Sequence, residues 1–394
     1  MIILTSTYYK PHIGGVENSL FFLADAYNKI GKKVVIVSSD KGKGKYRLNK
    51  FELIDNIEVI RYKSYTKGGV LGSFLKPIIE LIRIRRVLQE IKKKSEVDLV
   101  IARNHINSLA SSSLRLETKY LVPGIYINQS KTNLITVNRI KKFILLNIVF
   151  PYQSLFQILA LNKANGIYVF SVAMKDQIKT LLKKNIPIAI VNPGVDIEKF
   201  SKTNDLNIKT KYKLNNDFVF LCVGRLVKEK GFSYAIEALS KMKNVKTKLL
   251  IVGEGVEYNN LNEITKQLQL EDRVVFAGGI TQNVEDFYLM SNAFLLTSVK
   301  ETFGQIVLEA LASKLPIIAW KSGGAINTAT SEILKNKTNG FLIDFDIEKL
   351  AYFMDRISLM HKQELTIIGS ENYKLATSKY CWINLAKSLM YEDN

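Results

Sequence analysis

Two glutamates spaced across the start of an expected helix are the residues with the clearest chemical potential. Glu301 and Glu309 belong to the segment ETFGQIVLE, which follows an apolar run at Ala293–Thr297. If Phe303–Ala312 is helical, a rise of about 1.5 Å per residue puts the two carboxylates roughly 12 Å apart along its axis. That span resembles the separation of the sugar and the ribose in a nucleotide sugar. A solvated loop acid followed by a helix-face acid is the plainer alternative.

The backbone between the two acids could bind the phosphates of such a ligand. Amides in the first turn of a helix have no partner within the helix, and the helix dipole favours an anion there. A glycine lets the backbone approach the ligand closely. The residues that would contribute are Phe303, Gly304, Gln305 and Ile306.

Two cations follow a second apolar run, at Phe218–Val223. In the segment CVGRLVKEKGF, Gly224 and Arg225 end the run, and Lys230 precedes a helix expected over Gly231–Lys243. A guanidinium and an ammonium that converge on one point suit a diphosphate, whose charge must be stabilised when it leaves. Taken singly, the same residues could be exposed surface charges.

Glycine turns follow two further apolar runs. Gly14 and Gly15 come after Ile2–Thr5 and would open a helix with bare amides. Gly253 lies in the segment VGEG, where Tyr258 occupies the last glycine position of a GxGxxG motif. A dinucleotide cofactor is therefore disfavoured.

The segment Asp344-Phe-Asp346 has the spacing of a metal-binding DxD. It follows an expected strand at Gly340–Ile343, and Asp346 stands where the N-cap of the next helix belongs. The histidines also lack metal-ligand spacing. We therefore interpret Asp346 as a helix cap and expect no metal site.

Apolar runs of strand length alternate with helix-length segments along the chain. The expected strands, besides those already named, are Lys33–Ser38, Ile57–Arg61, Asp98–Ala102, Tyr120–Ile127, Gly166–Phe170, Ile188–Val191, Leu249–Val252, Val274–Phe276 and Pro316–Trp320. The expected helices of the first half are Val16–Ile30, Pro77–Lys94, Val137–Lys163 and Ala173–Lys183. This alternation is typical of α/β folds with parallel sheets and crossover helices.

The length of 394 residues favours two domains. A polar stretch at Ser201–Asn216 predicts a linker between two doubly wound, Rossmann-like domains that face each other across a cleft. We expect the two domains to divide near residue 197. In such sheets ligands bind beyond the carboxyl ends of the strands, where the residues above are found.

Cysteine usage and the N-terminus both favour a cytoplasmic protein. Cys222 and Cys381 are far apart, which disfavours a disulfide framework or a structural zinc site. The N-terminus lacks the features of a signal peptide. The longest apolar stretch, Phe143–Leu161, is interrupted by polar residues and falls short of the ~20 apolar residues that a spanning helix needs.

Positive charge is concentrated in the first half of the sequence. Residues 1–197 carry 31 Lys and Arg against 13 Asp and Glu, whereas residues 198–394 carry 25 against 23. An anionic partner of the first half is therefore expected, namely a membrane surface, a lipid-diphosphate acceptor or nucleic acid. No nucleic-acid-binding motif or aromatic-basic platform is present, so we expect no nucleic-acid partner. A merely solubilising surface is the alternative.

The stretch Leu75–Lys94 combines apolar positions at helical spacing with a strongly basic remainder. Such a helix could lie in the interface of an anionic membrane. The alternative is a helix with one face packed on the sheet and the other solvated.

Taken together, these motifs resemble the family 4 glycosyltransferases of GT-B fold. The matching segments, in order, are Pro-x-x-Gly-Gly-x-Glu at 11–17, Val-Gly-Arg-Leu-x-x-x-Lys-Gly at 223–231, Val-Gly-Glu-Gly at 252–255, and Glu-x-Phe-Gly-(x)4-Glu-Ala at 301–310. The resemblance also includes VNPGVD at 191–196 and KYCW at 379–382, and so covers nearly the whole chain. It implies a C-terminal helix that crosses back to the N-terminal domain. Residues 1–197 with about 376–394 would then form an acceptor-side domain, and residues 198–375 a nucleotide-sugar-binding domain.

The resemblance also implies roles for the candidate residues. Arg225 and Lys230 would bind the donor diphosphate, Glu301 the donor sugar and Glu309 the ribose. The backbone from Phe303 to Ile306 would surround the sugar and phosphate, with Gly14 and Gly15 covering the phosphate and Gly224 and Gly253 completing the donor site. In this family the anomeric configuration is retained and no protein nucleophile is required.

One position departs from the family pattern. Where family members commonly carry a histidine that contacts the donor sugar, this chain has Asn128. An asparagine can still hydrogen-bond a hydroxyl. His105 could compensate, or could be a surface or satisfied histidine.

The resemblance leads us to expect a retaining, metal-independent hexosyltransferase without a cofactor. Its co-substrate would be a nucleotide diphosphate sugar, a UDP-sugar rather than a GDP-sugar, and its acceptor a lipid-linked or envelope glycan at the inner face of the plasma membrane. The alternatives are a GT-B enzyme with a soluble sugar acceptor, such as a phosphorylase or synthase, and a non-catalytic GT-B subunit that partners another glycosyltransferase.

Overall fold

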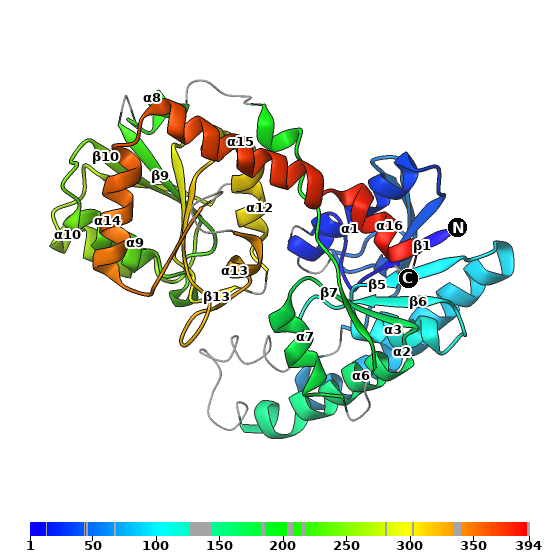
Figure 1. The fold of residues 1–394 in the computed structure, drawn as a ribbon. Helices are drawn as coiled ribbons and strands as arrows, with labels where there is room; N and C mark the ends of the chain where they lie inside the picture. The colour runs from blue at the N-terminus through cyan, green and yellow to red at the C-terminus, as the bar shows by residue number, and fades with distance from the viewer. Residues whose placement is uncertain are drawn as a thin grey trace. The chain divides into compact units, whose positions relative to one another are not determined.

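The computed structural model describes residues 1–12, 14–42, 44, 46–66, 68–126, 143–182, 186–202, 208–214, 217–279, 282–301, 303–334 and 340–391. The chain forms two compact units (Figure 1). The first unit comprises Met1–Gly194 and Trp382–Asn394, and the second comprises Val195–Cys381. The sequence placed these boundaries after residue 197 and near residue 376, so the units divide a few residues away from the expected positions.

The first unit is built on a sheet with the strand order β3-β4-β2-β1-β5-β6-β7-β8. Neighbouring strands are parallel except β3 and β4, which form an antiparallel hairpin. The strands are β1 (Ile2–Thr5), β2 (Val34–Ser39), β3 (Phe51–Ile54), β4 (Ile57–Tyr62), β5 (Leu99–Ala102), β6 (Thr118–Leu121), β7 (Gly166–Val169) and β8 (Ile188–Ile190).

The hairpin strand β3 was not predicted from the sequence. Its turn is Asp55-Asn56, and both residues have positive φ angles, of 50° and 61°. Asp and Asn tolerate this conformation, which suits a tight hairpin. Phe51 and Leu53 remain 63% and 69% exposed at the edge of the sheet, so the strand lacks the buried apolar run that marks the others.

Helices cover both faces of the first sheet. Alternate residues of β1 point to opposite sides, so that Ile2 and Leu4 join one core and Ile3 another. The first core is closed by α1 (Gly15–Lys29) and α16 (Trp382–Met390). The opposite face is covered by α2 (Gly69–Lys94), α3 (His105–Ser112), α6 (Phe150–Lys163) and α7 (Val172–Lys179).

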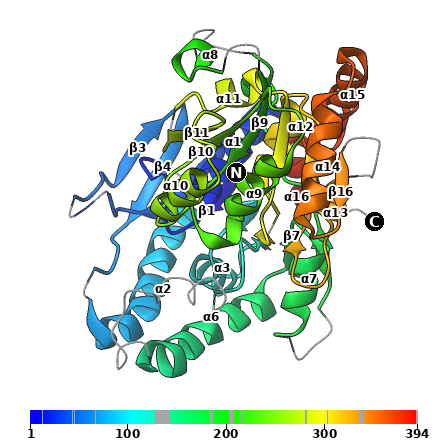
Figure 2. The same cartoon turned by 90° about the vertical axis from the view of Figure 1, so that its left-hand side faces the viewer.

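Helix α2 begins at Gly69, well before the predicted start at Pro77, which lies inside the helix. A proline cannot donate to the carbonyl four residues earlier, which here belongs to Ser73. The amide of Gln153 in α6 donates to that carbonyl instead, at 3.1 Å. The helix therefore continues through the proline, and α2 and α6 lie side by side (Figures 1 and 2).

The helix predicted over Val137–Lys163 falls partly outside the described residues. Within them, a π-helical turn at Leu145–Val149 leads into α6. Pro151 stands in the first turn of α6, where a missing amide costs no helical hydrogen bond.

The second unit contains a parallel sheet with the strand order β11-β10-β9-β12-β14-β16. Its strands are β9 (Phe218–Val223), β10 (Thr247–Val252), β11 (Val274–Gly278), β12 (Ala293–Leu296), β14 (Ile317–Trp320) and β16 (Phe341–Ile343). A separate short ladder pairs β13 (Lys300–Glu301) with β15 (Asn327–Thr328). The predicted α/β class with parallel sheets in two domains is confirmed.

Helices again pack on both faces of this sheet. One core includes α9 (Phe232–Lys241), α10 (Tyr258–Gln267) and α14 (Ile347–Ser358). The other includes α11 (Glu285–Met290), α12 (Gln305–Ala312), α13 (Thr330–Ile333) and α15 (Lys362–Lys379). In each face, apolar residues of alternate sheet positions fill the space under the helices.

The polar stretch Ser201–Asn216 is not a linker between the units but part of the second one. It contains the end of a 3-10 turn, Lys199–Ser201, and the short helix α8, Ile208–Lys211. Ile208 and Leu214 are buried in the core of that unit. The mostly polar composition of this segment gave no indication of these two buried apolar residues, which pack the segment against the second unit.

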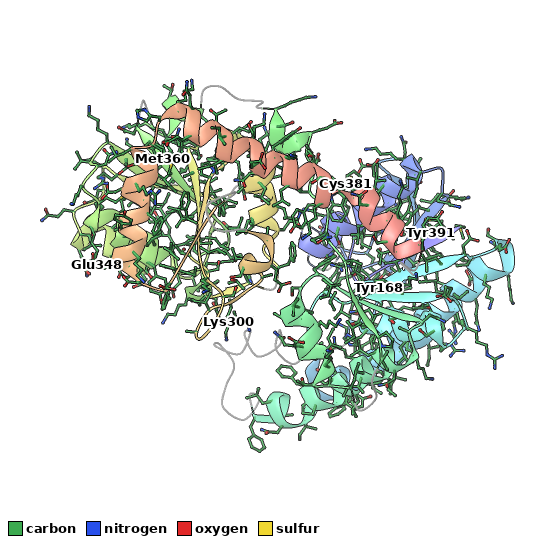
Figure 3. The ribbon with its side chains drawn as sticks, viewed as in Figure 1. Tyr168, Lys300, Glu348, Met360, Cys381 and Tyr391 are labelled. Atoms are coloured by element: carbon green, nitrogen blue, oxygen red, sulfur yellow. The ribbon has the colours of Figure 1, made fainter. Side chains whose placement is uncertain are left out.

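Helix α16 belongs to the first unit, although Cys381 before it belongs to the second (Figure 3). The Trp382 ring stacks on Phe22 of α1, with ring centres 5.5 Å apart. The Tyr27 hydroxyl donates to the Ala386 carbonyl at 3.1 Å. A Cβ at Gly194 would collide with the Trp382 ring, so glycine is needed where the chain leaves the first unit. The expectation that the last helix returns to the N-terminal domain is confirmed.

Over the described residues, no helix combines the length and the apolar composition that crossing a membrane requires.

Candidate functional site

A short loop after β9 carries the two predicted cations. The strand ends at Val223, and the loop closes with a 3-10 turn at Lys228–Lys230 before α9 begins. Gly231 ends this turn in the left-handed conformation, with φ of 62°. A Cβ at this position would also collide with the Thr297 carbonyl. The loop therefore packs directly on the chain that follows β12.

Lys230 and Glu301 form an ion pair, although 71 residues separate them in the sequence. Their side chains are only 16% and 19% exposed. Glu301 belongs to the short strand β13, next to Lys300, which is labelled in Figure 3. A charge-assisted hydrogen bond in such a sheltered place is stronger than one between fully exposed groups. The structure thus brings Lys230, which was predicted to bind phosphate, into contact with Glu301, which was predicted to bind the sugar.

Arg225 does not take part in this pair. It is exposed, and its guanidinium has no hydrogen bond or ion pair with any of the described residues. Leu226, next to it, is fully buried and anchors the loop. The guanidinium is therefore available to a ligand. The structure shows no direct contact between Arg225 and Lys230, which were predicted to converge on one point.

Further hydrogen bonds hold the Lys230 loop against the segment after β12. The Thr297 hydroxyl donates to the Lys230 carbonyl at 3.0 Å, and the Val299 amide donates to the Glu229 carbonyl at 2.9 Å. The buried Trp320 in turn donates its indole N–H to the Thr297 carbonyl at 2.9 Å. Sequence reasoning missed Thr297 and Trp320, because nothing local to either residue indicates this contact.

Two glycines allow close contact between neighbouring strand ends. Gly224 and Gly253 follow β9 and β10, with φ angles of 145° and 149°. A Cβ at Gly253 would overlap the Gly224 carbonyl. Gly253 is thus required by the contact between the two backbone turns, and the Lys230 side chain passes 3.4 Å from the position that a Cβ at Gly224 would take.

Helix α12 begins at Gln305, two residues later than predicted. Gly304 precedes it in the left-handed conformation, with φ of 82°, so that the helix cannot include Phe303. The Val307 amide already donates to the Gly304 carbonyl at 2.8 Å. The side chains of Phe303 and Ile306 pack against the core. Both side chains are partly buried, and the backbone of these residues is the part that was predicted to contact a donor.

Glu309 lies on α12, beneath the helix start, and accepts a hydrogen bond from the Tyr288 hydroxyl at 2.6 Å. Burial raises the pKa of Glu309, while the Tyr288 hydroxyl and the Lys199 ammonium oppose this rise. Tyr288 itself is fully buried in α11 and was not predicted from the sequence. One carboxylate oxygen is thus held in place by the Tyr288 hydroxyl.

In the first unit, Gly14 and Gly15 occupy the start of α1, as predicted. Gly14 is the N-cap in an extended conformation, and Gly15 is the first helical residue. A Cβ at Gly15 would meet open space. A ligand could therefore approach the helix start at this point.

His105 is not a surface residue. It opens α3, is only 8% exposed, and meets the Tyr126 ring edge-on at 5.3 Å. Burial lowers the pKa of His105 to about 4, so the imidazole is neutral near pH 7. Asn128, the position that departs from the family pattern, lies outside the described residues.

Asp344 and Asp346 have local partners within the second unit. Asp346 is the N-cap of α14 and accepts hydrogen bonds from the amides of Glu348 and Lys349 at 2.8 and 3.2 Å. Asp344 pairs with the Lys349 ammonium at 2.6 Å. The capping interpretation of Asp346 is confirmed. Across the part of the chain that the structure describes, no cluster of three or more His, Cys, Asp or Glu residues could hold a metal ion.

Comparison with known proteins supports the family resemblance. Residues 204–378 match the family model described as Glycosyl transferases group 1. An uncharacterized glycosyltransferase of Haemophilus influenzae is 30% identical over 277 residues, which cover 68% of this chain and 73% of the relative. N-acetyl-alpha-D-glucosaminyl L-malate synthase of Bacillus anthracis is 28% identical over 186 residues. That match spans 47% of each protein, so the chain covers about half the length of this relative.

The fold also matches solved structures over nearly the whole chain. The structure of HepE from Anabaena in complex with UDP and glucose has a TM-score of 0.73, with 98% of this chain and 97% of that chain covered. At 20% identity this likeness shows the fold alone. It is the GT-B fold that the motifs implied. Together with the family model and the Haemophilus relative, it shows that this chain belongs to the group 1 glycosyl transferases of GT-B fold.

Proposed function

We propose that this chain transfers a hexose-type sugar, with retention of configuration, from a nucleoside diphosphate sugar to a lipid-linked or envelope-glycan acceptor. Membership of the glycosyltransferase family supplies the class of reaction. The observation that best supports the donor assignment is the sheltered pair of Lys230 and Glu301 beside the glycine turns. It brings a cation for the diphosphate next to a carboxylate for the sugar.

In the proposed reaction the bond between the anomeric carbon and the diphosphate oxygen breaks, and a bond to the acceptor oxygen forms. The acceptor proton moves to the departing diphosphate, so no protein nucleophile takes part. Lys230 and Arg225 stabilise the charge that grows on the leaving group. Glu301 positions the sugar, and Glu309 binds the ribose.

The diphosphate assignment is tested by replacing each cation with alanine. Arg225→Ala and Lys230→Ala should each lower kcat/KM by on the order of a hundredfold, from roughly 2–4 kcal/mol of lost transition-state stabilisation. Lys228→Ala is the matched control, since Lys228 is an exposed lysine of the same turn. Near-normal turnover in both test variants would refute the assignment.

The donor nucleotide is proposed to be UDP. The similar fold of HepE was solved with UDP and glucose, which favours UDP over GDP. A thermal-shift panel of UDP, GDP, ADP and their sugars checks this, because a true donor stabilises the folded state by mass action. Stronger stabilisation by GDP-sugars than by UDP-sugars would contradict the choice of nucleotide.

The reaction is proposed to need no metal ion, because Arg225 and Lys230 supply the positive charge and Asp346 serves as a helix cap. Activity should persist in excess EDTA. Loss of activity in EDTA, with rescue by Mn²⁺ or Mg²⁺, would show that a metal is required.

We further propose that the first unit docks on the anionic inner face of the plasma membrane, through the apolar first half of α2 rather than through the basic residues of its second half. The second half of α2 packs on the sheet through Ile84, Val87, Leu88 and Ile91. Arg83, Arg85 and Lys92 make hydrogen bonds to their own unit. The first half of α2 instead exposes an apolar stripe made of Leu71, Leu75, Ile78 and Ile82, at 72%, 37%, 43% and 44%.

The neighbouring helix α6 also exposes apolar side chains. Leu155 and Leu159 are 56% and 46% exposed, and Ile148 in the preceding turn is 48% exposed. Tyr152 of α6 donates to the Phe74 carbonyl of α2 at 3.2 Å, which holds the two helices together. Exposed apolar side chains on a basic unit suit the interface of an anionic bilayer.

Sedimentation with liposomes of graded anionic-lipid content tests the docking surface. Replacing Leu71 and Ile78 with Gln should reduce binding strongly, whereas Ile367→Gln should not. Ile367 is a comparably exposed apolar residue, at 65%, on the other unit. High salt should weaken binding because it screens the basic charges. If the wild type does not bind anionic liposomes at low salt, a soluble acceptor becomes the better candidate, as the name N-acetyl-alpha-D-glucosaminyl L-malate synthase of one relative suggests.

A further inference from the structure

A cavity of about 510 Å³ opens in the first unit, apart from the proposed donor residues. Its walls combine hydroxyls, aromatic rings and charged groups rather than apolar side chains alone. The lining residues are Thr7, Tyr8, Ser39, Lys41, Gly44, Tyr46, Arg47, Ser64, Tyr65, Thr66, Lys76 and Glu80. Sequence reasoning singled out none of them as site residues.

The cavity lies at the carboxyl ends of three neighbouring strands. Thr7 and Tyr8 follow β1, Ser39 ends β2, and Ser64 follows β4, while α2 closes the site with Lys76 and Glu80. Open α/β sheets bind ligands at this edge, where loops rather than strands provide the side chains. The position is thus that of a binding site in a doubly wound sheet.

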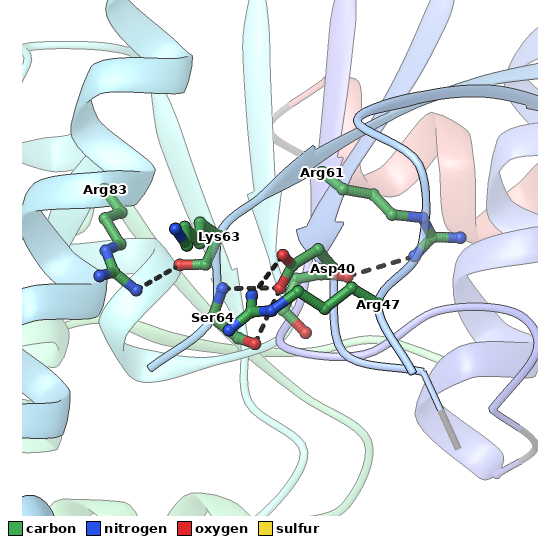
Figure 4. A network of polar contacts seen from close by, with 7 residues as sticks. Asp40, Arg47, Arg61, Lys63, Ser64 and Arg83 are labelled. Carbon is green, nitrogen blue, oxygen red and sulfur yellow. Dashed lines mark hydrogen bonds and ion pairs between the residues drawn. The ribbon is translucent and has the colours of Figure 1, made fainter. Parts of the chain in front are cut away.

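One cation of the cavity is neutralised by its own unit. The Arg47 guanidinium donates to Asp40 at 2.5 Å, and Asp40 accepts from both the amide and the hydroxyl of Ser64 at 2.8 Å (Figure 4). Burial acts to raise the pKa of Asp40, but the Ser64 and Arg47 hydrogen bonds lower it overall, so the carboxylate stays ionised. This network fixes the wall of the cavity.

Two lysines supply positive charge beyond that network. Among the described residues, neither Lys41 nor Lys76 has an ion pair. Among the described residues that line the cavity, the acid is Glu80, which is 5% exposed, and burial raises its pKa against the opposing Lys76 ammonium. Two ammonium groups thus stand against a single carboxyl, so the lysine charges are only partly compensated even when Glu80 is ionised. The cavity therefore favours an anion.

The remaining walls suit a sugar or polyol. Tyr8, Tyr46 and Tyr65 offer aromatic rings, and Tyr46 is 83% exposed at the rim. Ser39 adds a buried hydroxyl that has no hydrogen-bond partner among the described residues. Pockets of a few hundred Å³ with a few convergent polar groups are typical small-molecule sites.

We propose that this cavity is the acceptor site and that the acceptor is a sugar or polyol bearing an anionic group, a phosphate or a carboxylate, which Lys41 and Lys76 bind. This inference rests on the proposed transferase function and specifies its acceptor. The lysines hold the charged group, and the tyrosines contact the ring. A hydroxyl of the same molecule remains available to accept the transferred sugar.

Calorimetric titration with three related probes tests the charge requirement. Glucose 6-phosphate and glucuronate should bind at least about tenfold more tightly than uncharged glucose. Lys41→Gln and Lys76→Gln should each remove most of this difference, and the double variant all of it. Lys32→Gln, an exposed lysine of the same unit away from the cavity, is the matched control. Glu80→Gln should bind the anionic probes at least as well as the wild type.

An unchanged unfolding transition of the first unit, followed by the fluorescence of Trp382, shows that the variants fold. Equal binding of charged and uncharged probes, or unaltered binding in the double lysine variant, would overturn the proposal.

Failure of the acceptor proposal can be told apart from failure of the transferase proposal. If sugar transfer to a neutral acceptor proceeds and ignores both lysines, the acceptor proposal fails while the proposed function stands. If anionic probes bind through the lysines but transfer is absent, the proposed function fails instead. Vesicles containing phosphatidylinositol identify the source of the anion. If these vesicles compete with glucose 6-phosphate for the protein, the acceptor is lipid-borne. If they do not compete, the acceptor is soluble.

Discussion

At the scale of single residues, burial sets the acid–base behaviour of two predicted site residues. His105 is enclosed beside Tyr126, and its pKa falls to about 4. Glu309 is held by Tyr288, and burial raises its pKa. Both shifts favour the neutral form, because a low-dielectric surrounding penalises charge. The two residues therefore respond to pH in opposite senses.

The His105 shift predicts acid sensitivity of the first unit. The folded-state pKa of about 4 lies below the ordinary value of 6.5, so the unfolded chain takes up a proton first as the pH falls. Stability is complete above pH 6.5 and is lost towards pH 4, by roughly 3 kcal/mol. His105→Gln should remove most of this dependence in urea unfolding at pH 7.5 and 4.5. An identical loss in wild type and variant would contradict the assignment.

The Glu309 shift predicts the reverse dependence for the second unit. A folded-state pKa raised above the ordinary 4.5 gives stability that is present at low pH and lost as the pH rises through the raised value. Glu309→Gln, which can still accept from Tyr288, should therefore be at least as stable as the wild type at pH 7. It should also bind nucleoside diphosphate more weakly by calorimetry. Lower stability of the variant at pH 7, or unchanged nucleotide affinity, would refute the proposed role.

At the scale of elements, the loops that carry the candidate residues are shaped by backbone contacts. Gly231 turns the chain from the Lys230 loop into α9 while touching the Thr297 carbonyl. Gly304 stops α12 from starting earlier, which leaves Glu301 on a separate short strand. The ion pair between Lys230 and Glu301 depends on both turns, because each fixes the backbone on one side of the pair.

Replacing Gly231 with Ala should therefore damage both stability and donor binding. The substitution combines a left-handed φ of 62° with a collision against the Thr297 carbonyl. Gly324→Ala is the matched control, since Gly324 has a φ of 58° but open space around its Cβ position. We expect Gly324→Ala to cost about 1 kcal/mol and Gly231→Ala clearly more, with a loss of UDP affinity. Equal effects of the two substitutions would show that the close contact does not matter.

At the scale of the whole molecule, the last helix completes the core of the first unit. Leu385, Ala386 and Leu389 of α16 are buried with residues of α1 and β1. The first unit is thus finished only by residues that follow the entire second unit in the sequence. The stability of the N-terminal domain therefore depends on the C-terminal end of the chain.

Leu385→Ala should destabilise the first unit by about 2–5 kcal/mol through lost burial and a new cavity. Lys387→Ala, an exposed position of the same helix, should change stability little. The two tryptophans, Trp382 in the first unit and Trp320 in the second, report on the units separately. Single-tryptophan variants should show a shifted transition for Trp382 and an unchanged one for Trp320. A shift confined to Trp320 would contradict the packing of α16.

Sequence by itself determined the features that rest on local patterns. Apolar runs of strand length located most strands of both sheets, because buried parallel strands need continuous apolar residues. Asp346 was recognised as a helix cap, because capping depends on neighbouring amides. The motifs around Arg225 and Glu301 indicated the family and its fold, because the residue types and spacing within each motif can be read directly along the chain.

Tertiary structure alone decided which distant residues meet. The partnership of Lys230 with Glu301, the hold of Tyr288 on Glu309 and the burial of His105 have no local signal. The same applies to the anion-favouring cavity, whose lining comes from four elements of the first unit. Helix α2 passes through Pro77 because another helix satisfies the freed carbonyl of Ser73. Hydrogen bonds and burial act through space, so these outcomes depend on the packing of segments that the sequence keeps far apart.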